Sequence, residues 1–198
     1  MLKYSRSRWL DISFYFLFVL VAILSVLIFS FSIDDYYGRR MPKSESSLEY
    51  SNFSSYLQEL KAQDNYLVFI VINQNNNECY DPSAFESLLS FGFSENALLG
   101  DENSSCRFIG IWNGDILYQN HSFERNIKFS GNIDNKYCYI SCSSPENSTY
   151  GLIYVNDFQY SINHQGINIV VIDNERNEFI DSICYDVFSE DLTVYRVV

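Results

Sequence analysis

The pattern of apolar and polar positions divides the chain into one long uncharged run and a later series of short apolar segments. The run covers residues 14–33 and contains no charged side chain. In a helix twenty residues span about 30 Å, which is the thickness of a bilayer's hydrocarbon core. The later segments are short and are separated by Gly, Asn, Asp or Pro, a pattern typical of strands. The sequence therefore predicts one membrane-spanning helix followed by a strand-rich domain.

Two helices and several strands are predicted within this domain. The first helix, residues 48–61, repeats apolar side chains along one face. The second opens at Asp81-Pro82, where Asp81 caps and Pro82 suits the first turn, and it ends near Gly92. Strands are predicted at residues 66–72, 107–112, 137–142, 151–155, 167–172 and 178–185, with 194–198 as a closing strand or a frayed tail.

Turn residues connect two pairs of these strands. Asn113-Gly114 is the strongest hairpin dipeptide, and residues 173–177 form a second polar turn. Neighbouring strands joined by short turns pair antiparallel. The fold class expected is α+β, with mostly antiparallel sheets and helices packed on them.

Charge is unevenly placed along the chain, whose net charge is −12. Residues 1–43 contain six basic and three acidic side chains, so the remainder carries −15. Basic residues before the apolar run and acidic residues after it place the N-terminus in the cytosol under the positive-inside rule. A domain this acidic repels phosphate backbones, so nucleic acid is not an expected partner.

The expected organisation is therefore a cytosolic basic tail, a signal-anchor, a juxtamembrane linker and an extracytoplasmic domain, at residues 1–13, 14–33, 34–46 and 47–198. A cleaved signal peptide is the alternative, with Ser30 and Ser32 as the small residues of a cleavage site. Either interpretation exports the domain.

Export would allow disulfides among the cysteines, which are Cys79, Cys106, Cys138, Cys142 and Cys184. Cys138 and Cys142 lie four apart in one predicted strand, so both point to the same face and are poor mutual partners. Four tripeptides match the N-glycosylation pattern and begin at Asn52, Asn103, Asn120 and Asn147. No metal site is expected, because the chain has two His residues and neither has metal-ligand spacing.

Catalytic motifs are absent from the sequence. It contains no nucleophile elbow, no phosphate-binding Gly-rich loop and no zinc-protease His pair. His121 and His164 lie in polar settings typical of solvent-exposed His, and the acid pairs Asp101-Glu102 and Glu190-Asp191 resemble solvated loops. The protein is expected not to be an enzyme and to need no cofactor, with an unrecognised hydrolase as the remaining alternative.

Two segments near the C-terminus resemble the interleukin-like EMT inducer domain. They read Gly-Ile-Asn-Ile-Val-Val-Ile-Asp at residues 166–173 and Phe-Ile-Asp-Ser-Ile-Cys-Tyr-Asp-Val-Phe at residues 179–188. The family has a Gly-Arg-Gly-Leu-Asn strand, a turn, and a second strand ending Phe-Asp-Thr-Tyr. Residues 66–72, the helix to Phe91-Gly92 and residues 108–114 resemble the other half of that domain. Because the Gly-Leu-Asn counterpart comes last here, the chain resembles a circular permutation of the family.

The resemblance implies two antiparallel sheets flanked by helices and a non-catalytic binding module. Family members include cytokine-like proteins and the sugar-binding stem domain of an O-mannose N-acetylglucosaminyltransferase. A glycan is therefore the candidate ligand, with a protein ligand as a second option. Three charged positions of the family fall at Gln165, Asn73 and Asn103, which are all uncharged. These three residues would surround one pocket, with Trp112 either as a stacking surface or as ordinary core.

An alternative function is also consistent with the resemblance. The chain could be an accessory or stem subunit of a membrane-associated enzyme that assembles surface polysaccharide or glycoprotein. This alternative requires the apolar run at residues 14–33 to pack against another membrane protein. The permutation makes a separate geometric prediction, namely that the strand end near residues 187–188 lies beside the start of the first helix.

Overall fold

The computed structural model describes residues 52–73, 81–98, 107–143, 151–187 and 192–197, together with Val19. The chain divides into two compact units, Met1–Arg40 and Met41–Val198. Val19 in the first unit is helical. Among the residues described, no helix is long and apolar enough to cross a membrane. The predicted span at residues 14–33 lies outside the described residues except for Val19, so it stays a prediction.

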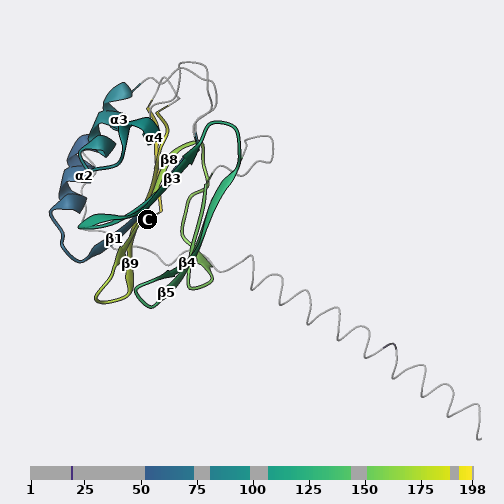
Figure 1. Cartoon of the computed structure of the whole chain (residues 1–198). Coiled ribbons are helices and arrows are strands. Elements are labelled where there is room, and N and C mark those ends of the chain that lie inside the picture. The colour runs from purple at the N-terminus through teal and green to yellow at the C-terminus, as the bar shows by residue number, and fades with distance from the viewer. Residues whose placement is uncertain are drawn as a thin grey trace, which may run out of the picture. The chain divides into compact units, whose positions relative to one another are not determined.

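The second unit is built from antiparallel sheets and short helices, which confirms the α+β fold class (Figure 1). The helices are α2 (Phe53–Lys61), α3 (Pro82–Leu89) and α4 (Glu95–Leu98). The strands are β1 (Tyr66–Asn73), β2 (Arg107–Asn113), β3 (Asp115–Ser122), β4 (Ile127–Ile133), β5 (Lys136–Cys142), β6 (Leu152–Val155), β7 (Phe158–Gln159), β8 (Gly166–Asp173), β9 (Glu178–Tyr185) and β10 (Val194–Arg196). They form one sheet in the order β10-β9-β8-β1-β2-β3 and a second in the order β4-β5-β6-β7.

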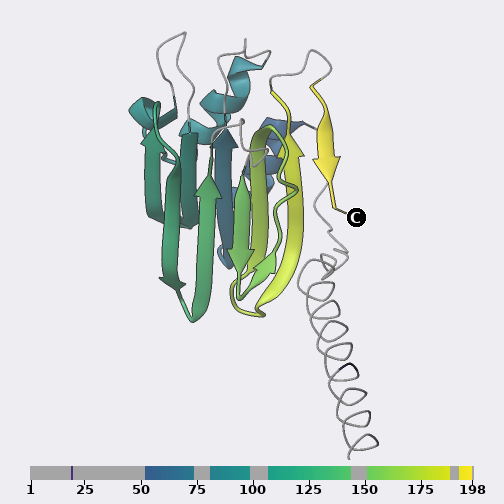
Figure 2. The ribbon, with the colours of Figure 1, turned by 90° about the vertical axis from the view of Figure 1, so that its right-hand side faces the viewer.

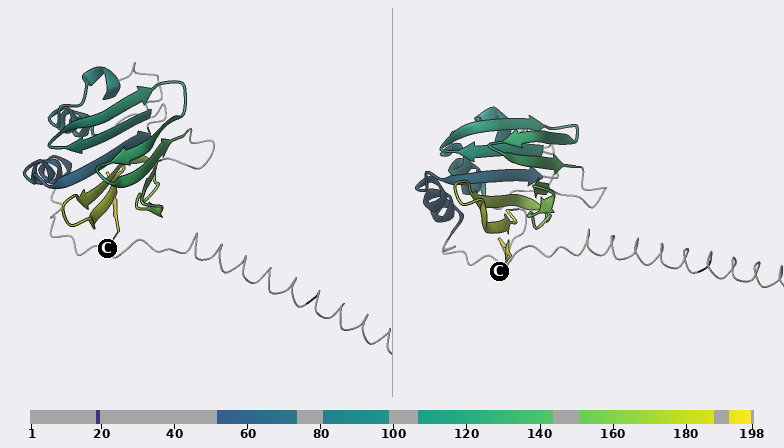
Figure 3. Two further views of the ribbon diagram at one scale, coloured as in Figure 1. Left: turned by 60° about the horizontal axis from the view of Figure 1, so that its bottom comes forward. Right: turned by 90° about the horizontal axis from the view of Figure 1, so that it is seen from below.

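These elements make three layers. The helices cover one face of the six-stranded sheet, and the four-stranded sheet packs on its other face (Figures 1 and 3). The central strands β1, β2 and β8 are buried almost throughout. Covering on both faces explains why their sequences are continuous apolar runs rather than alternating ones.

Alternation along each central strand assigns its side chains to one of two cores. Along β1, Val68, Ile70 and Ile72 pack under the helices. Leu67, Phe69 and Val71 pack between the sheets, against residues of β5 and β6 such as Ile140 and Ile153. The sequence led us to expect sheets flanked by helices. In the described residues all the helices lie on one face of the six-stranded sheet.

Local capping chemistry sets the ends of the two longer helices. The side chain of Asn52 accepts a hydrogen bond from the Ser55 N–H at 2.8 Å and caps α2. Asp81 caps α3 by accepting from the Ser83 N–H at 3.1 Å, with Pro82 in the first turn as predicted. Residues 48–51 of the predicted first helix lie outside the described residues.

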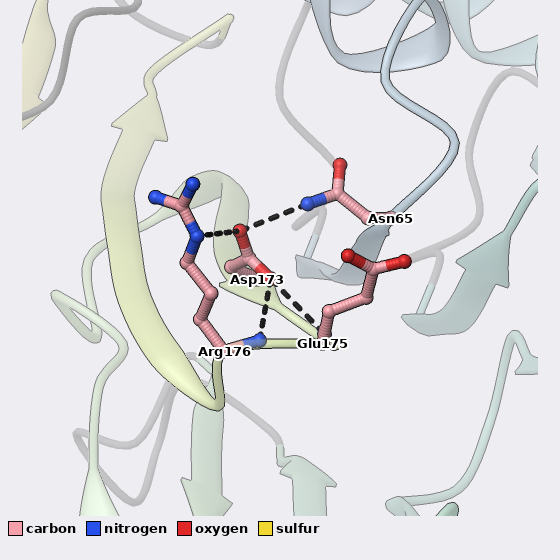
Figure 4. A network of polar contacts seen from close by, with 4 residues as sticks. All are labelled: Asn65, Asp173, Glu175 and Arg176. Atoms are coloured by element: carbon pink, nitrogen blue, oxygen red, sulfur yellow. Dashed lines mark hydrogen bonds and ion pairs between the residues drawn. The ribbon is translucent and has the colours of Figure 1, made fainter.

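Strands β8 and β9 form the predicted hairpin, paired from Ile167 opposite Tyr185 to Asp173 opposite Glu178. Asp173 holds the turn, since its Oδ1 accepts from the backbone N–H groups of Glu175 and Arg176 at 3.0 and 2.8 Å. The Asn65 side chain donates to Asp173 Oδ2 at 2.8 Å (Figure 4). Asp173 therefore connects the turn to Asn65, just before β1, and also stabilises the turn by accepting from its own backbone N–H groups.

The same turn also reaches the second sheet. Buried Lys136 donates to Asn174 Oδ1 at 2.7 Å, and the Asn174 amide donates to Asp134 Oδ2 at 2.8 Å. These hydrogen bonds close one end of the space between the sheets with polar groups that all have partners.

The end of β9 lies beside the start of α2, as the permutation predicted. The rings of Tyr185 and Phe53 stack with centroids 4.8 Å apart, and Val187 belongs to the same core under the helices. Phe188 lies outside the described residues. This proximity is the geometry that a circular permutation requires. It does not test the family resemblance, which stays a prediction.

Strands β3, β4 and β7 were not predicted. In β3 most side chains are exposed or half-buried, and the segment reads Asp-Ile-Leu-Tyr-Gln-Asn-His-Ser. Strand β4 likewise carries exposed polar residues on one face. Their place in the sheets comes from pairing with neighbours, since β3 extends the β2 hairpin at Gly114 and β4 pairs with β5.

Candidate functional site

Two of the residues predicted to bind ligand meet at one end of the six-stranded sheet. Asn73, the last residue of β1, lies opposite Gly166, so Gln165 is next to this pair. Asn73 is 1% exposed and its amide donates to the backbone carbonyl of Ser143 at 2.5 Å. Gln165 is half-buried. Their roles toward a glycan stay predictions, and Asn103 lies outside the described residues.

Trp112 is a core residue. Its side chain is 2% exposed and packs under the helices, with its ring edge-on to Phe91 at a centroid distance of 5.0 Å. A sugar needs an exposed aromatic face to stack on, and Trp112 offers none. Of the two alternatives that the sequence left open for Trp112, ordinary core packing is the one observed.

Arg107 was missed by the sequence analysis and lies at the same end of the sheet. It is the first residue of β2 and pairs with Asn73 on one side and Ser122 on the other. The side chain is 6% exposed. A charged residue at the edge of an apolar run usually points to solvent. No local signal in the sequence distinguishes this buried Arg from an exposed one.

His164 and Cys184 lie close together but do not make a nucleophile–base pair. The Cys184 thiol donates to the backbone carbonyls of His164 and Gln165 at 3.6 and 3.3 Å. Burial, reinforced by the charge of Asp186, raises the pKa of Cys184 well above its usual value. The thiol is therefore protonated at neutral pH, and a protonated thiol is not the reactive form.

The cysteines that the structure describes, Cys138, Cys142 and Cys184, are all buried. Cys138 and Cys142 both point into the core between the sheets, as their spacing predicted. Cys142 donates to the Ile72 carbonyl at 3.1 Å, and burial raises the pKa of Cys138 to about 11. Cys79 and Cys106 lie outside the described residues.

A group of tyrosines occupies the exposed face of the four-stranded sheet, the face turned to the viewer in Figure 2. We call this the tyrosine face. It consists of Tyr137, Tyr139, Tyr154, Gln159 and Ser130. Tyr139 lies directly opposite Tyr154 across β5 and β6, and their rings meet edge-to-face at a centroid distance of 6.0 Å. Tyr137 is 46% exposed, which is unusual for a large aromatic side chain.

Hydrogen bonds fix the orientation of two of these rings. The Tyr137 hydroxyl lies 2.8 Å from Ser130 Oγ, and the Tyr154 hydroxyl donates to Gln159 Oε1 at 3.2 Å. Because the rings are held before a ligand arrives, less conformational entropy is lost on binding. Tyrosine combines an apolar ring with a polar hydroxyl, which suits contacts to ligands that present both C–H and O–H groups.

The tyrosine face is also poor in charge. Among the outward-pointing positions of β4 to β7, Lys128 is the charged residue. The second unit as a whole is strongly acidic. This face is therefore a place where a neutral ligand can dock without desolvating carboxylates.

Within the part of the chain that the structure describes, no group of three or more His, Cys, Asp or Glu side chains could hold a metal ion. Comparisons with protein-family models, with curated proteins and with solved structures found no match.

Proposed function

We propose that this chain is a non-catalytic, membrane-anchored binding module that recognises a neutral carbohydrate through the tyrosine face. The observation that carries the proposal is the pre-positioned set of Tyr137, Tyr139 and Tyr154 on a solvent-facing sheet. Sugar rings offer C–H faces to aromatic rings and hydroxyls to amide and phenol groups. The resemblance to a family with a sugar-binding member supports the same ligand class.

The test is a glycan array probed with the full chain in mild detergent, followed by calorimetric titration of each hit. Replacing Tyr137 by Ala removes an exposed ring and is expected to weaken binding about two- to tenfold, because an aromatic contact contributes about 0.5–1.5 kcal/mol. Tyr137→Phe removes only the hydroxyl and separates ring stacking from hydrogen bonding.

Leu117 is the matched control, because it is 49% exposed on β3 and lies outside the tyrosine face. Leu117→Ala should leave glycan affinity unchanged. Glycan binding that survives Tyr137→Ala and Tyr154→Ala in a folded protein would show that the ligand binds elsewhere. Silence across the array, with capture of a defined protein, would replace the carbohydrate by a protein ligand.

Membrane anchoring through residues 14–33, with the domain outside the cytosol, is part of the same proposal. It rests on the uncharged run and on Lys3, Arg6 and Arg8 before it. A reporter fused after Val198 should be active only outside the cytosol, and protease added to intact cells should remove it. A cytosolic reporter signal would overturn export and with it the extracytoplasmic ligand.

A further inference from the structure

Arg107, the first residue of β2, is a buried cation at one end of the space between the two sheets. Strand alternation places its side chain on the same face as Ile109 and Ile111, which lie in the core between the two sheets. Its side chain is more than nine-tenths buried. The neighbour on β1 facing the same way is Asn73, a neutral amide. Arg107 therefore occupies the end of the inter-sheet space opposite the turn at residues 174–177.

Two of the three guanidinium nitrogen atoms of Arg107 are buried without a hydrogen-bond partner among the described residues. These two atoms are Nε and Nη1. The ion pairs found among the described residues involve two other arginines, Arg176 and Arg196. Arginine does not lose its proton in proteins, so it cannot escape burial by becoming neutral.

A buried, unpaired guanidinium costs several kcal/mol, and native structures almost always compensate such a group. The closed end of the same sandwich shows how compensation is achieved. Lys136 is also buried, at 5% exposure, and its ammonium donates to the side chain of Asn174 at 2.7 Å. Thus the fold provides a hydrogen-bond acceptor for the Lys136 ammonium, whereas two N–H donors of Arg107 remain without an acceptor among the described residues.

We propose that Arg107 is an anion-binding site that takes a carboxylate or phosphate group of a small ligand at this end of the sheet. The guanidinium supplies several N–H donors in a planar fork that matches such oxyanions. Asn73 lies beside it as a neutral neighbour that adds no negative charge. Because Arg107 is only 6% exposed, an extended anionic surface could not contact its guanidinium, so the proposed ligand is small. The site is separate from the tyrosine face and does not depend on it.

The experiment follows thermal unfolding of the full chain in mild detergent while inorganic phosphate, glucuronate or neutral glucose is titrated at constant ionic strength with chloride. Ligand that binds only the folded state raises the unfolding midpoint. Phosphate or glucuronate should raise it in a saturable way that depends on Arg107, whereas a rise with glucose reports the tyrosine face and should be the same in Arg107→Met. The larger of the two anion responses identifies whether phosphate or carboxylate is preferred.

Arg107→Met keeps the apolar stem and removes the charge. This variant should unfold at a higher temperature than the unmodified chain when no anion is present, because the uncompensated charge is gone. Its response to the preferred anion should fall about ten- to a hundredfold in apparent affinity, as expected for lost charged hydrogen bonds. Arg107→Lys keeps the charge without the fork and should bind with intermediate affinity.

Lys136→Met is the matched control, since it removes a buried cation that already has an acceptor. It should lower the unfolding midpoint and leave the anion response intact. The proposal is overturned if the unmodified chain gains no stability from either anion. It is equally overturned if Arg107→Met responds like the unmodified chain, or if Arg107→Met is destabilised without anion, which would reveal an acceptor within the chain itself. If Arg107→Met does not fold, Arg107→Lys and the unmodified titration still decide between these outcomes.

Discussion

A buried hydrogen-bond network joins α2 and β10 to β9, and the loss of unfolding free energy on its disruption can be calculated. Asp181 is fully buried and accepts from Arg196 Nε at 3.0 Å, from Arg196 Nη2 at 2.9 Å and from the Tyr56 hydroxyl at 3.1 Å. Tyr56 is also fully buried, and its pKa is raised well above the usual value by burial and by the neighbouring Asp181 carboxylate. The tyrosine is therefore a neutral donor, and Arg196 supplies the compensating charge.

Replacing Arg196 by Met removes both charged hydrogen bonds and leaves the carboxylate in the core with the Tyr56 hydroxyl. Breaking one side of a buried pair costs about 3–5 kcal/mol. A domain of this size has a total stability of about 5–15 kcal/mol, so the loss is a large part of it. Removing Asp181 and the Tyr56 hydroxyl as well, in Tyr56→Phe/Asp181→Leu/Arg196→Met, should recover most of the loss, because the buried carboxylate and the hydroxyl that bonds it are then gone.

Urea unfolding of the full chain, followed by the fluorescence of buried Trp112, measures these differences. Arg176→Met is the control: its side chain is 75% exposed, and its Nε lies 3.9 Å from Oδ2 of buried Asp173. Because this arginine faces solvent and Asp173 keeps its bonds from Asn65 and two backbone N–H groups, the loss should be at most about 1 kcal/mol. A loss for Arg196→Met no greater than for Arg176→Met would refute the reasoning. So would a triple variant less stable than Arg196→Met alone.

Three further predictions concern stability and reactivity. Gly166→Ala should cost about 3 kcal/mol or more in unfolding free energy, because φ is +118° and a Cβ would lie 2.3 Å from the Tyr185 carbonyl oxygen. Gly114→Ala is the control, since Gly114 has φ +74° but open space around it, and it should cost less. Equal losses in the two variants would refute the role of the clash. Asp81→Ala should cost about 1–2 kcal/mol at pH 7, since the residue caps α3 and accepts from the Tyr185 hydroxyl at 2.7 Å. Burial alone would raise the pKa of Asp81, but hydrogen bonds from Ser83 and Tyr185 outweigh burial and lower the pKa. The stabilisation by the ionised Asp81 carboxylate is therefore present above about pH 4 and is lost as the pH falls through the folded-state pKa. Urea titrations at pH 7 and pH 3 should show the two proteins converging, and a gap that widens in acid would contradict the sign. Burial raises the pKa of Cys138 to about 11, so about one molecule per thousand carries the thiolate at pH 8. Peptide mapping after treatment with iodoacetamide should therefore find Cys138 unlabelled until urea unfolds the domain. Rapid labelling of the native protein would contradict its burial.

Features that depend on local chemistry were predictable from the sequence. The strands β1, β2 and β8 follow from continuous apolar runs, and the turn after Asn113 follows from Gly114, which adopts a positive φ. The caps at Asp81 and at the turn of the β8–β9 hairpin follow from short polar side chains that bond their own backbone. In each case the residues that cause the structure lie within a few positions of it.

The candidate sites were decided by tertiary structure, because exposure depends on which layer covers each side of a strand. Trp112 is buried by the helices above the six-stranded sheet, whereas Tyr137 is exposed because no described element covers the outer face of the four-stranded sheet. Arg107 lies at the edge of an apolar run like many surface arginines, yet it shares the face of β2 that packs on the second sheet and is 6% exposed. The apolar pattern determined that sheets form. The stacking of three layers determined which aromatic rings stay exposed and which cations are buried.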